Sequence, residues 1–463
     1  MRDVCRSGPD RFEIAGAGSA PNNAAPSLLA RISLKAQLSP GLWVDLNKQP
    51  VYHADPEFSS VCKTYINQRE MIAMNSAVEH HPPRNKNSSP LHIVKVEKRE
   101  TLNEFIRLVW PLYKDDPAWV PPLMLERRTQ FAPSNPYFEH ATYSTWVAYR
   151  EGKPVGRISA QVDRLHLEQH QDATGFFGML ESENNPETFQ ALLATAENWL
   201  HAKGMRRVAG PYNLSINQEL GLLVKGFETP PVIMMGHALP YYAKHIEANG
   251  YRQEKDLLAY IIDSDFKHPR SMQAVMARAK NRVKTRSIRK SDFTEELNII
   301  RDIFNDAWSQ NWGFVPWTNA EFEHLGKDLK MLVDEDLIII ASVDDEPAAF
   351  IVGLPNVNEA IRDLNGRLLP FGWLKLLWRL KVKYPETARV PLMGVRCRYQ
   401  DSLLGAALAF SVIAALQTPA IKHGIKQLEL SWILEDNRGM RNILEAISGR
   451  VYKTYRIYSK NLE

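Results

Sequence analysis

The residues best suited to chemistry lie near the C-terminus, where an apolar segment runs into a polar loop that opens a helix. The apolar segment covers residues 392–395, the loop contains Gln400, and small residues follow at Gly405 and Ala406. The first backbone N–H groups of a helix lack partners inside it, and the helix dipole adds partial positive charge there. Such a helix start suits an anion of the pyrophosphate kind. Basic Arg396 lies just before it, so the pattern predicts an anion site, with an ordinary strand-to-helix turn as the alternative.

A second group of polar residues lies one strand further along the chain. The alternating run 428–433 predicts a strand, and it leads to Asn437, a natural N-cap for a helix over 438–447. A last strand is expected over 451–458. Glu429 lies on the alternating strand and is a candidate general base, with a solvent-facing position as the alternative.

Together the two stretches resemble the cofactor half of a GNAT-type acyltransferase, a superfamily that moves acyl groups from coenzyme A to an acceptor, usually an amine. The resemblance implies that Asn437 starts the helix beside the pantetheine arm. It departs at Leu403, where the family's loop has glycine, and at Leu444, where many members carry the tyrosine that protonates the departing thiolate. It implies coenzyme A or acyl-coenzyme A as co-substrate, no metal, and a cofactor-binding set of Val395, Arg396, Gln400, Gly405, Ala406 and Asn437.

The order of expected elements is the same in both halves of the chain. Hairpin signals occur at 151–154 and 344–347, each between a helix and a further strand-helix-strand series. This is the GNAT order. We therefore expect an α/β fold with a mixed sheet, built as two tandem GNAT-like domains over 91–265 and 291–463 and joined by a basic linker over 266–290.

A run of amide and hydroxyl side chains in the first half is a candidate acceptor site. Asn213, Ser215, Asn217 and Glu219 alternate, so an extended chain would place them on one face. Glu219 is a second candidate base. The alternative is a solvated loop whose polar side chains cap its own backbone.

The second half carries an apolar insertion over about 355–389. Its centre predicts a helix on which Trp373 and Trp378 accompany Lys375 and Arg379. A wide apolar face with tryptophans and basic residues suits a lipid substrate or contact with a membrane surface through 368–383. A helix docked on its own protein is the alternative.

Composition sets the remaining limits. The chain has 463 residues, a mild net charge of +4 and three cysteines without metal-ligand spacing. No uncharged apolar run of about 18 residues and no secretory signal is evident. These features favour the cytoplasm, with the inner membrane surface as a further location if the insertion is free. Oligomeric state is not predicted.

Residues 1–90 lack hydrophobic periodicity and are rich in Pro, Ser and Asn, so we expect a disordered extension. Met71 and Met74 offer a later start, and a genuine disordered arm is the alternative. Residues 280–290 carry six basic side chains in eleven and no aromatic residue. A solvated linker is favoured over phosphate contact, and nucleic acid comes last.

The sequence therefore predicts an acyl-coenzyme A dependent N-acyltransferase acting on an amine, small or lipid. Catalysis is expected from Glu429 or Glu219, and substrate binding from Asn213, Ser215, Asn217, Trp373 and Trp378. Leu403 and Leu444 favour the alternative, a non-catalytic protein of the same fold that binds acyl-coenzyme A or a partner.

Overall fold

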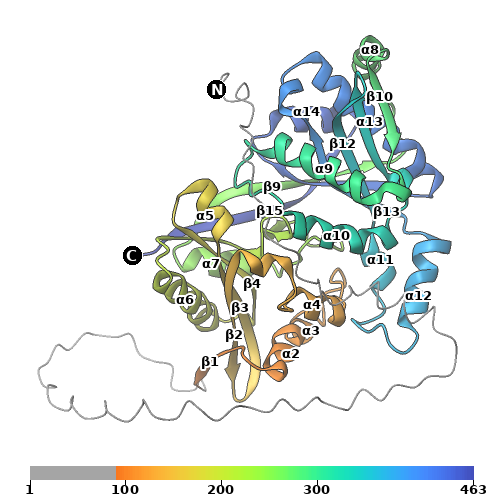
Figure 1. Cartoon of the computed structure of the whole chain (residues 1–463). Coiled ribbons are helices and arrows are strands. Elements are labelled where there is room, and N and C mark those ends of the chain that lie inside the picture. Colours follow the sequence, from red (N-terminus) through yellow and green to blue (C-terminus); the bar gives the residue numbers. More distant parts are fainter. Residues whose placement is uncertain (1–89) are drawn as a thin grey trace, which may run out of the picture.

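One continuous mixed sheet joins both halves of the chain in the computed structural model, which describes residues 90–463 (Figure 1). The predictions for the extension, including a start at Met71 or Met74, lie outside the described residues. The strands of the first half are β1 (Leu91–Lys95), β2 (Ala141–Arg150), β3 (Lys153–Asp163), β4 (Thr174–Ser182), β5 (Arg207–Gly210), β8 (Leu222–Lys225) and β9 (Arg252–Asp263). Those of the second half are β10 (Val283–Ser287), β11 (Ile338–Val343), β12 (Glu346–Pro355), β13 (Thr387–Val395), β14 (Gln427–Leu434) and β15 (Arg450–Asn461).

The two halves exchange their last strands at the centre of this sheet. β15 pairs with β5, β9 pairs with β14, and β9 and β15 pair with each other, so the central order is β5-β15-β9-β14. Tyr455 and Ile457 of β15 are buried in the core of the first half. Tyr260 and Ile262 of β9 are buried in the core of the second half. Each half thus completes its core with a strand from the other. The domain bounds 91–265 and 291–463 stay a prediction.

Each half contains one pair of parallel strands that separate along their length. In the second half, β13 pairs with β14 only as far as Val390 and Leu430, although the strands continue to Val395 and Leu434. In the first half, β4 and β5 pair only over residues 174–176 of β4. With antiparallel hairpins β2-β3 and β11-β12 beside these pairs, the expected tandem GNAT-like architecture is confirmed.

Helices cover the sheet, and their ends follow local sequence. Asn185 caps α6 (Pro186–Ala202) by accepting from the Glu187 N–H, with Pro186 in the first position. The other helices of the first half are α2 (Arg99–Arg107), α3 (Val109–Leu112), α4 (Met124–Gln130), α5 (Arg164–His170) and α7 (Tyr242–Ala248). Those of the second half are α8 (Arg270–Ala279), α9 (Phe293–Trp308), α10 (Asn319–Leu332), α11 (Val357–Ile361), α12 (Gly372–Trp378), α13 (Leu403–Lys422) and α14 (Arg438–Ala446).

Within residues 90–463, α13 is long and apolar enough to cross a membrane by length and composition. A single helix of this kind is weak evidence for a membrane span, because a buried core helix passes the same test. Half of the most apolar 18-residue segment of α13 is buried inside the protein. The helix packs against α8 and strands β10 to β13. Leu408 and Val412 on its inner face belong to the core. The burial is that of a core helix.

The helix expected at the centre of the insertion is α12, which continues into a π-helical turn over Arg379–Lys383. Leu376 and Leu380 on one side are buried against α11 and against Leu123. The other side carries a group of exposed large apolar residues, called here the apolar ridge: Leu369, Phe371, Leu374, Trp378 and Val382.

The stretch expected as a basic linker contains α8 and β10, and β10 is an edge strand paired with β11. Several of its cations form ion pairs with carboxylates of the same half. Arg286 and Arg289 both bind the buried Glu296, and Arg282 binds Asp344. Their charge is partly neutralised within the protein, which weakens the case for nucleic acid.

Candidate active site

A cavity of about 530 Å³ opens where β13 and β14 separate; it is called here the donor cavity. The starts of α13 and α14 form one end of it, and Trp308 of α9 lines a side wall. Five of the six residues predicted for the cofactor line this cavity, namely Val395, Gln400, Gly405, Ala406 and Asn437. Arg396 does not line it and binds Asp302 instead.

Local geometry makes the start of α13 rigid. Ser402 Oγ accepts from the Gly405 N–H at 3.0 Å and caps the helix. A Cβ on Gly405 would lie 2.1 Å from the Tyr399 carbonyl oxygen, so glycine is required for this close approach. Gln400 Nε2 donates to the carbonyl oxygens of Val395 and Ala307. The loop is thus held by its own side chains, before any ligand binds.

The two residues that depart from the GNAT pattern, Leu403 and Leu444, lie in different parts of the structure. Leu403 is half exposed and is absent from the donor-cavity lining, so its side chain does not narrow that cavity. Leu444 is fully buried in the core and supplies no proton. Asn437 caps α14 by accepting from the Met440 N–H at 3.0 Å.

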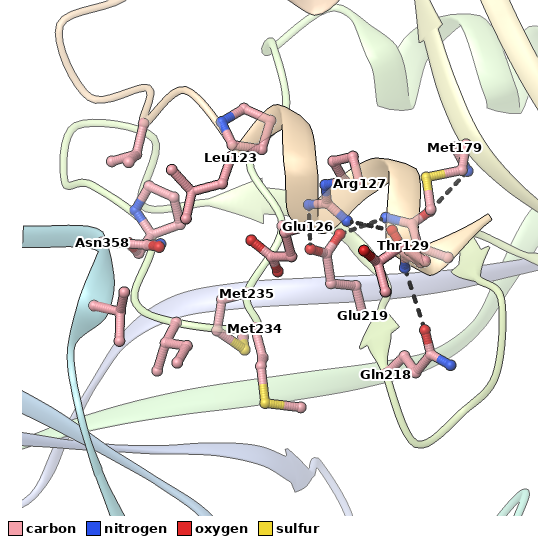
Figure 2. A pocket seen from close by; sticks show the side chains of 18 of the residues that line it. Leu123, Glu126, Arg127, Thr129, Met179, Gln218, Glu219, Met234, Met235 and Asn358 are labelled. Carbon is pink, nitrogen blue, oxygen red and sulfur yellow. Dashed lines mark hydrogen bonds and ion pairs between the residues drawn. The ribbon is translucent and has the colours of Figure 1, made fainter. Parts of the chain in front are cut away.

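A second cavity of about 380 Å³, the acceptor cavity, lies between the first half and the insertion (Figure 2). Figure 2 shows Arg127 and Glu219 facing each other at its polar end, with Leu123, Met234 and Asn358 farther along. The apolar end is lined from several segments by Val120, Leu123, Ile233, Val357, Ile361, Leu368 and Leu376. The cavity is therefore amphipathic.

The polar end is built from charged side chains of low exposure. Glu219 Oε1 lies 2.5 Å from Arg127 Nη2, and Asn213 Nδ2 donates to Glu219 Oε2 at 2.9 Å. Burial favours a raised pKa for Glu219, but the positive charge and hydrogen bond of Arg127 outweigh it and lower the pKa. Glu219, one of the two predicted candidate bases, is a carboxylate held in an ion pair with Arg127.

Glu181, near the end of β4, is a second carboxylate of this cavity that the sequence did not single out. Its Oε2 accepts from the hydroxyls of Tyr113 and Tyr242, both at 2.7 Å, and its Oε1 lies 3.7 Å from Arg157. Burial raises the pKa of Glu181 despite Arg157 and the two hydroxyls. Its tyrosine partners are remote in the chain, at separations of 68 and 61 positions, so no sequence spacing connects them.

His237 also lines the acceptor cavity, and nothing in the local sequence marked it. Its Nε2 lies 2.8 Å from Asp116 Oδ2. Because the two residues are 121 positions apart, no sequence spacing connects them.

The predicted polar run over 213–219 is not one extended chain, so that expectation is wrong. Residues 212–213 (β6) and 219–220 (β7) form a hairpin in which Asn213 pairs with Glu219. The hairpin still brings Asn213, Asn217 and Glu219 to the acceptor cavity, whereas Ser215 is absent from its lining. A turn can gather these side chains as well as a strand face can.

The two cavities share Asn217 and Trp317 in their walls, so they meet there. The separating wall is thin beside this junction, since Ser431 of the donor cavity lies 3.4 Å from the sulfur of Met235 in the acceptor cavity. The two cavities therefore adjoin at this junction and are separated there by single side chains.

Glu429 lies in neither lining and is fully buried, so the solvent-facing alternative for it is wrong. Tyr452 donates a hydrogen bond to its Oε2, and Arg389 lies 4.0 Å from its Oε1. Burial raises its pKa, which Arg389 opposes. Trp373 packs beside the buried face of α12 and Trp378 is exposed on the apolar ridge, and neither lines the donor cavity or the acceptor cavity.

Comparison with known proteins gives close relatives. No protein-family model matches the chain. It is 49% identical over 365 residues to "Protein YghO" of Escherichia coli (strain K12), covering 79% of this chain and 94% of that protein. It is 43% identical over 383 residues to "Bacterial ceramide synthase" of Caulobacter vibrioides (strain NA1000 / CB15N), covering 82% of this chain and 100% of that protein.

Similar solved structures are much more distant in sequence. A tandem GNAT protein from the clavulanic acid biosynthesis pathway has a TM-score of 0.47 at 12% identity, over 81% of this chain and 99% of that one. A GCN5-related N-acetyltransferase from Sphaerobacter thermophilus has a TM-score of 0.43 at 11% identity, over 81% and 98%. By the identity and coverage of the two sequence relatives, the chain belongs to the family that contains Escherichia coli protein YghO and the bacterial ceramide synthase of Caulobacter vibrioides.

Proposed function

We propose that the chain is an acyl-coenzyme A dependent N-acyltransferase that acylates a long-chain amine. The observation that carries the proposal is the junction of two unlike cavities at Asn217 and Trp317. One cavity starts at the N-terminus of a long helix, and the other combines carboxylates with an apolar end. An acyl donor and an amine placed in them would meet at the junction.

The donor cavity suits an acyl-coenzyme A in two respects. The start of the 20-residue helix α13 favours phosphate through its backbone N–H groups and dipole. At the inner end, Trp432 has φ 61°, a left-handed conformation that is rare for a bulky residue and is often associated with function. Its buried Nε1 has no hydrogen-bond partner among residues 90–463, so it can donate to a carbonyl oxygen of the donor.

The acceptor cavity suits an amine attached to a hydrocarbon chain. Glu181 and Glu219 offer negative charge to an ammonium group, and Leu123, Ile361 and Leu376 line the apolar end. The name of one relative, bacterial ceramide synthase, supports this choice, because a ceramide is a long-chain amine that carries an acyl group on nitrogen. Of the two predicted bases, Glu219 is within reach of such an amine and Glu429 is enclosed.

We also propose that the apolar ridge contacts an anionic membrane surface at the cytoplasmic face. Phe371 is 72% exposed, Val382 69% and Trp378 54%. Lys383 lies on the same turn, as does Lys381, whose ammonium group forms an ion pair with Asp334. The buried side of α12 lines the acceptor cavity through Leu376, so a lipid amine leaving the membrane would have a short path into the protein.

One observation favours a second candidate, a protein that binds acyl-coenzyme A without turnover. Leu444 is fully buried where many GNAT enzymes carry a tyrosine acid. The two candidates differ in a direct assay. The full chain is titrated calorimetrically with acetyl- and palmitoyl-coenzyme A, and thiol release is then followed with a long-chain amino alcohol such as sphinganine. Binding with amine-dependent thiol release supports the enzyme, whereas binding without release supports the sensor.

A further inference from the structure

We propose that His237 is the base that accepts the proton of the amine, and that Asp116 orients it. This inference rests on the proposed function and assigns a role to two residues that the sequence did not single out. It follows from the position of the His237 ring in the acceptor cavity and from the partners of its two nitrogen atoms.

The imidazole of His237 is held at one nitrogen, and its other nitrogen is buried without a hydrogen-bond partner among the described residues. Nε2 lies 2.8 Å from Asp116 Oδ2, and the other carboxylate oxygen of Asp116 accepts from the Ala118 N–H at 2.8 Å. Because the carboxylate accepts the proton on Nε2, the lone pair of the neutral ring is on Nδ1. Nδ1 is buried and has no hydrogen-bond partner among residues 90–463.

A buried nitrogen without a partner is costly in a folded protein, so its retention calls for a ligand that supplies the missing hydrogen bond. The side chain of His237 is only 3% exposed, yet it lines the acceptor cavity together with Glu181 and Glu219. The N–H of an amine in this cavity is the donor that fits the lone pair on Nδ1.

The surroundings of His237 keep the ring neutral and fixed. Burial lowers the pKa of His237, the carboxylate of Asp116 opposes this, and the charge of Lys453 adds to the lowering. The ring of Tyr113 lies at 5.8 Å, centroid to centroid, and its hydroxyl oxygen, which donates its proton to Glu181, lies 3.3 Å from the His237 carbonyl oxygen. A neutral imidazole at neutral pH can accept a proton.

The other candidates in reach are less suited to this step. Glu219 is neutralised by Arg127, and the lowered pKa makes it a weak base. Oε2 of Glu181 already accepts two hydroxyl protons. These carboxylates are better placed to attract the ammonium group than to deprotonate it.

Acyl transfer removes protons from the amine nitrogen and delivers one to the departing thiolate. The ammonium group first releases one proton to solvent. The neutral amine nitrogen then forms a bond to the thioester carbonyl carbon, the carbon–sulfur bond breaks, and a second proton on nitrogen moves to His237 Nδ1. The imidazolium then gives this proton to the departing thiolate, which supplies the acid that Leu444 cannot. Asp116 stabilises the transient imidazolium by its charge and holds the ring in place, as a positioning residue.

The test uses the full chain with palmitoyl-coenzyme A and sphinganine as probes. His237→Gln removes the base, Asp116→Asn removes the orienting charge, and His201→Gln, on the exposed end of α6, is the matched control. Calorimetric binding of the donor and thermal unfolding are measured for each variant. The rate of thiol release is measured from pH 5 to pH 9.

We expect His237→Gln to lower kcat by about 10²- to 10⁴-fold, with donor binding unchanged and the acidic limb of the kcat/KM profile lost. Asp116→Asn should lower kcat by a smaller factor and shift the acidic limb of the kcat/KM profile. If His237→Gln does not fold, Asp116→Asn still tests the assignment. If His237→Gln retains kcat within about threefold and keeps the acidic limb, the assignment is overturned while the proposed function stands. If the parent protein releases no thiol with any amine, both are overturned.

Discussion

Asn217 Nδ2 donates to the carbonyl oxygen of Val315 at 3.2 Å, and this hydrogen bond joins the two halves of the chain where the two cavities meet. Asn217 comes from the β6-β7 hairpin of the first half, and Val315 from the loop after α9 in the second. The candidate active site therefore needs both halves together. The exchange of β9 and β15 has the same consequence, because neither half completes its core alone.

Filling the donor cavity should abolish donor binding. Ala406 lines this cavity at the start of α13, and Ala406→Trp would occupy space needed by the pantetheine arm. We expect the Kd for palmitoyl-coenzyme A, measured by calorimetry, to rise at least about tenfold. Thr418→Trp, at an exposed position of the same helix, is the control. Equal affinity of both variants would place the donor elsewhere. Gly405 is a poorer target because any Cβ there meets the Tyr399 carbonyl.

Removing a carboxylate from the acceptor cavity should weaken amine binding selectively. In Glu181→Gln the side chain keeps its shape and loses its charge, so we expect KM for a long-chain amine to rise about 10- to 100-fold. The KM for the acyl donor should not change. Glu187→Gln, half exposed on α6, is the matched control. An unchanged KM for the amine in Glu181→Gln would argue against an ammonium group beside this carboxylate.

A buried histidine between the halves should make stability depend on pH. His140 lies 2.9 Å from Asp163 and 3.3 Å from Glu321. Burial favours a lower pKa, but the two carboxylates outweigh it and raise the pKa of His140 from 6.5 to about 9. The group is protonated more readily in the folded state. Its stabilisation is therefore complete below about pH 6.5 and is lost as the pH rises through about 9.

The check is urea unfolding of the parent protein and of His140→Gln between pH 6 and pH 10. The difference in urea midpoint between the parent and His140→Gln should be largest at pH 6 and shrink toward pH 10. The comparison isolates His140 because the other titrating groups are common to both proteins. A difference that is constant across this range would show that the charge of His140 does not contribute.

Membrane contact should depend on the apolar ridge. Phe371→Ser and Trp378→Ser together remove two of its large exposed side chains, so we expect flotation with anionic phosphatidylglycerol vesicles to be lost. Val94→Ser, an exposed apolar residue on β1, is the control and should float like the parent. Absence of flotation by the parent would remove the membrane proposal and leave the cavities as they are.

The sequence predicted the features of the candidate site that depend on neighbouring residues, namely helix starts and helix caps. The strand-loop-helix unit before Gly405 and the cap at Asn437 are present because N-caps and helix starts depend on neighbouring residues. The exchange of β9 and β15 was out of reach, because strand partners about 200 residues apart leave no periodic signal. For the same reason the pair His237 and Asp116 emerged only from the folded chain.

The measurement that tests the central claim most directly is mass spectrometry of the product formed from ¹³C-labelled palmitoyl-coenzyme A and sphinganine. We expect a labelled amide that the parent protein forms, that Ala406→Trp loses and that His237→Gln forms in strongly reduced amount. Donor binding by the parent without labelled amide, with this amine or shorter ones, would contradict an N-acyltransferase and favour a protein that only binds acyl-coenzyme A.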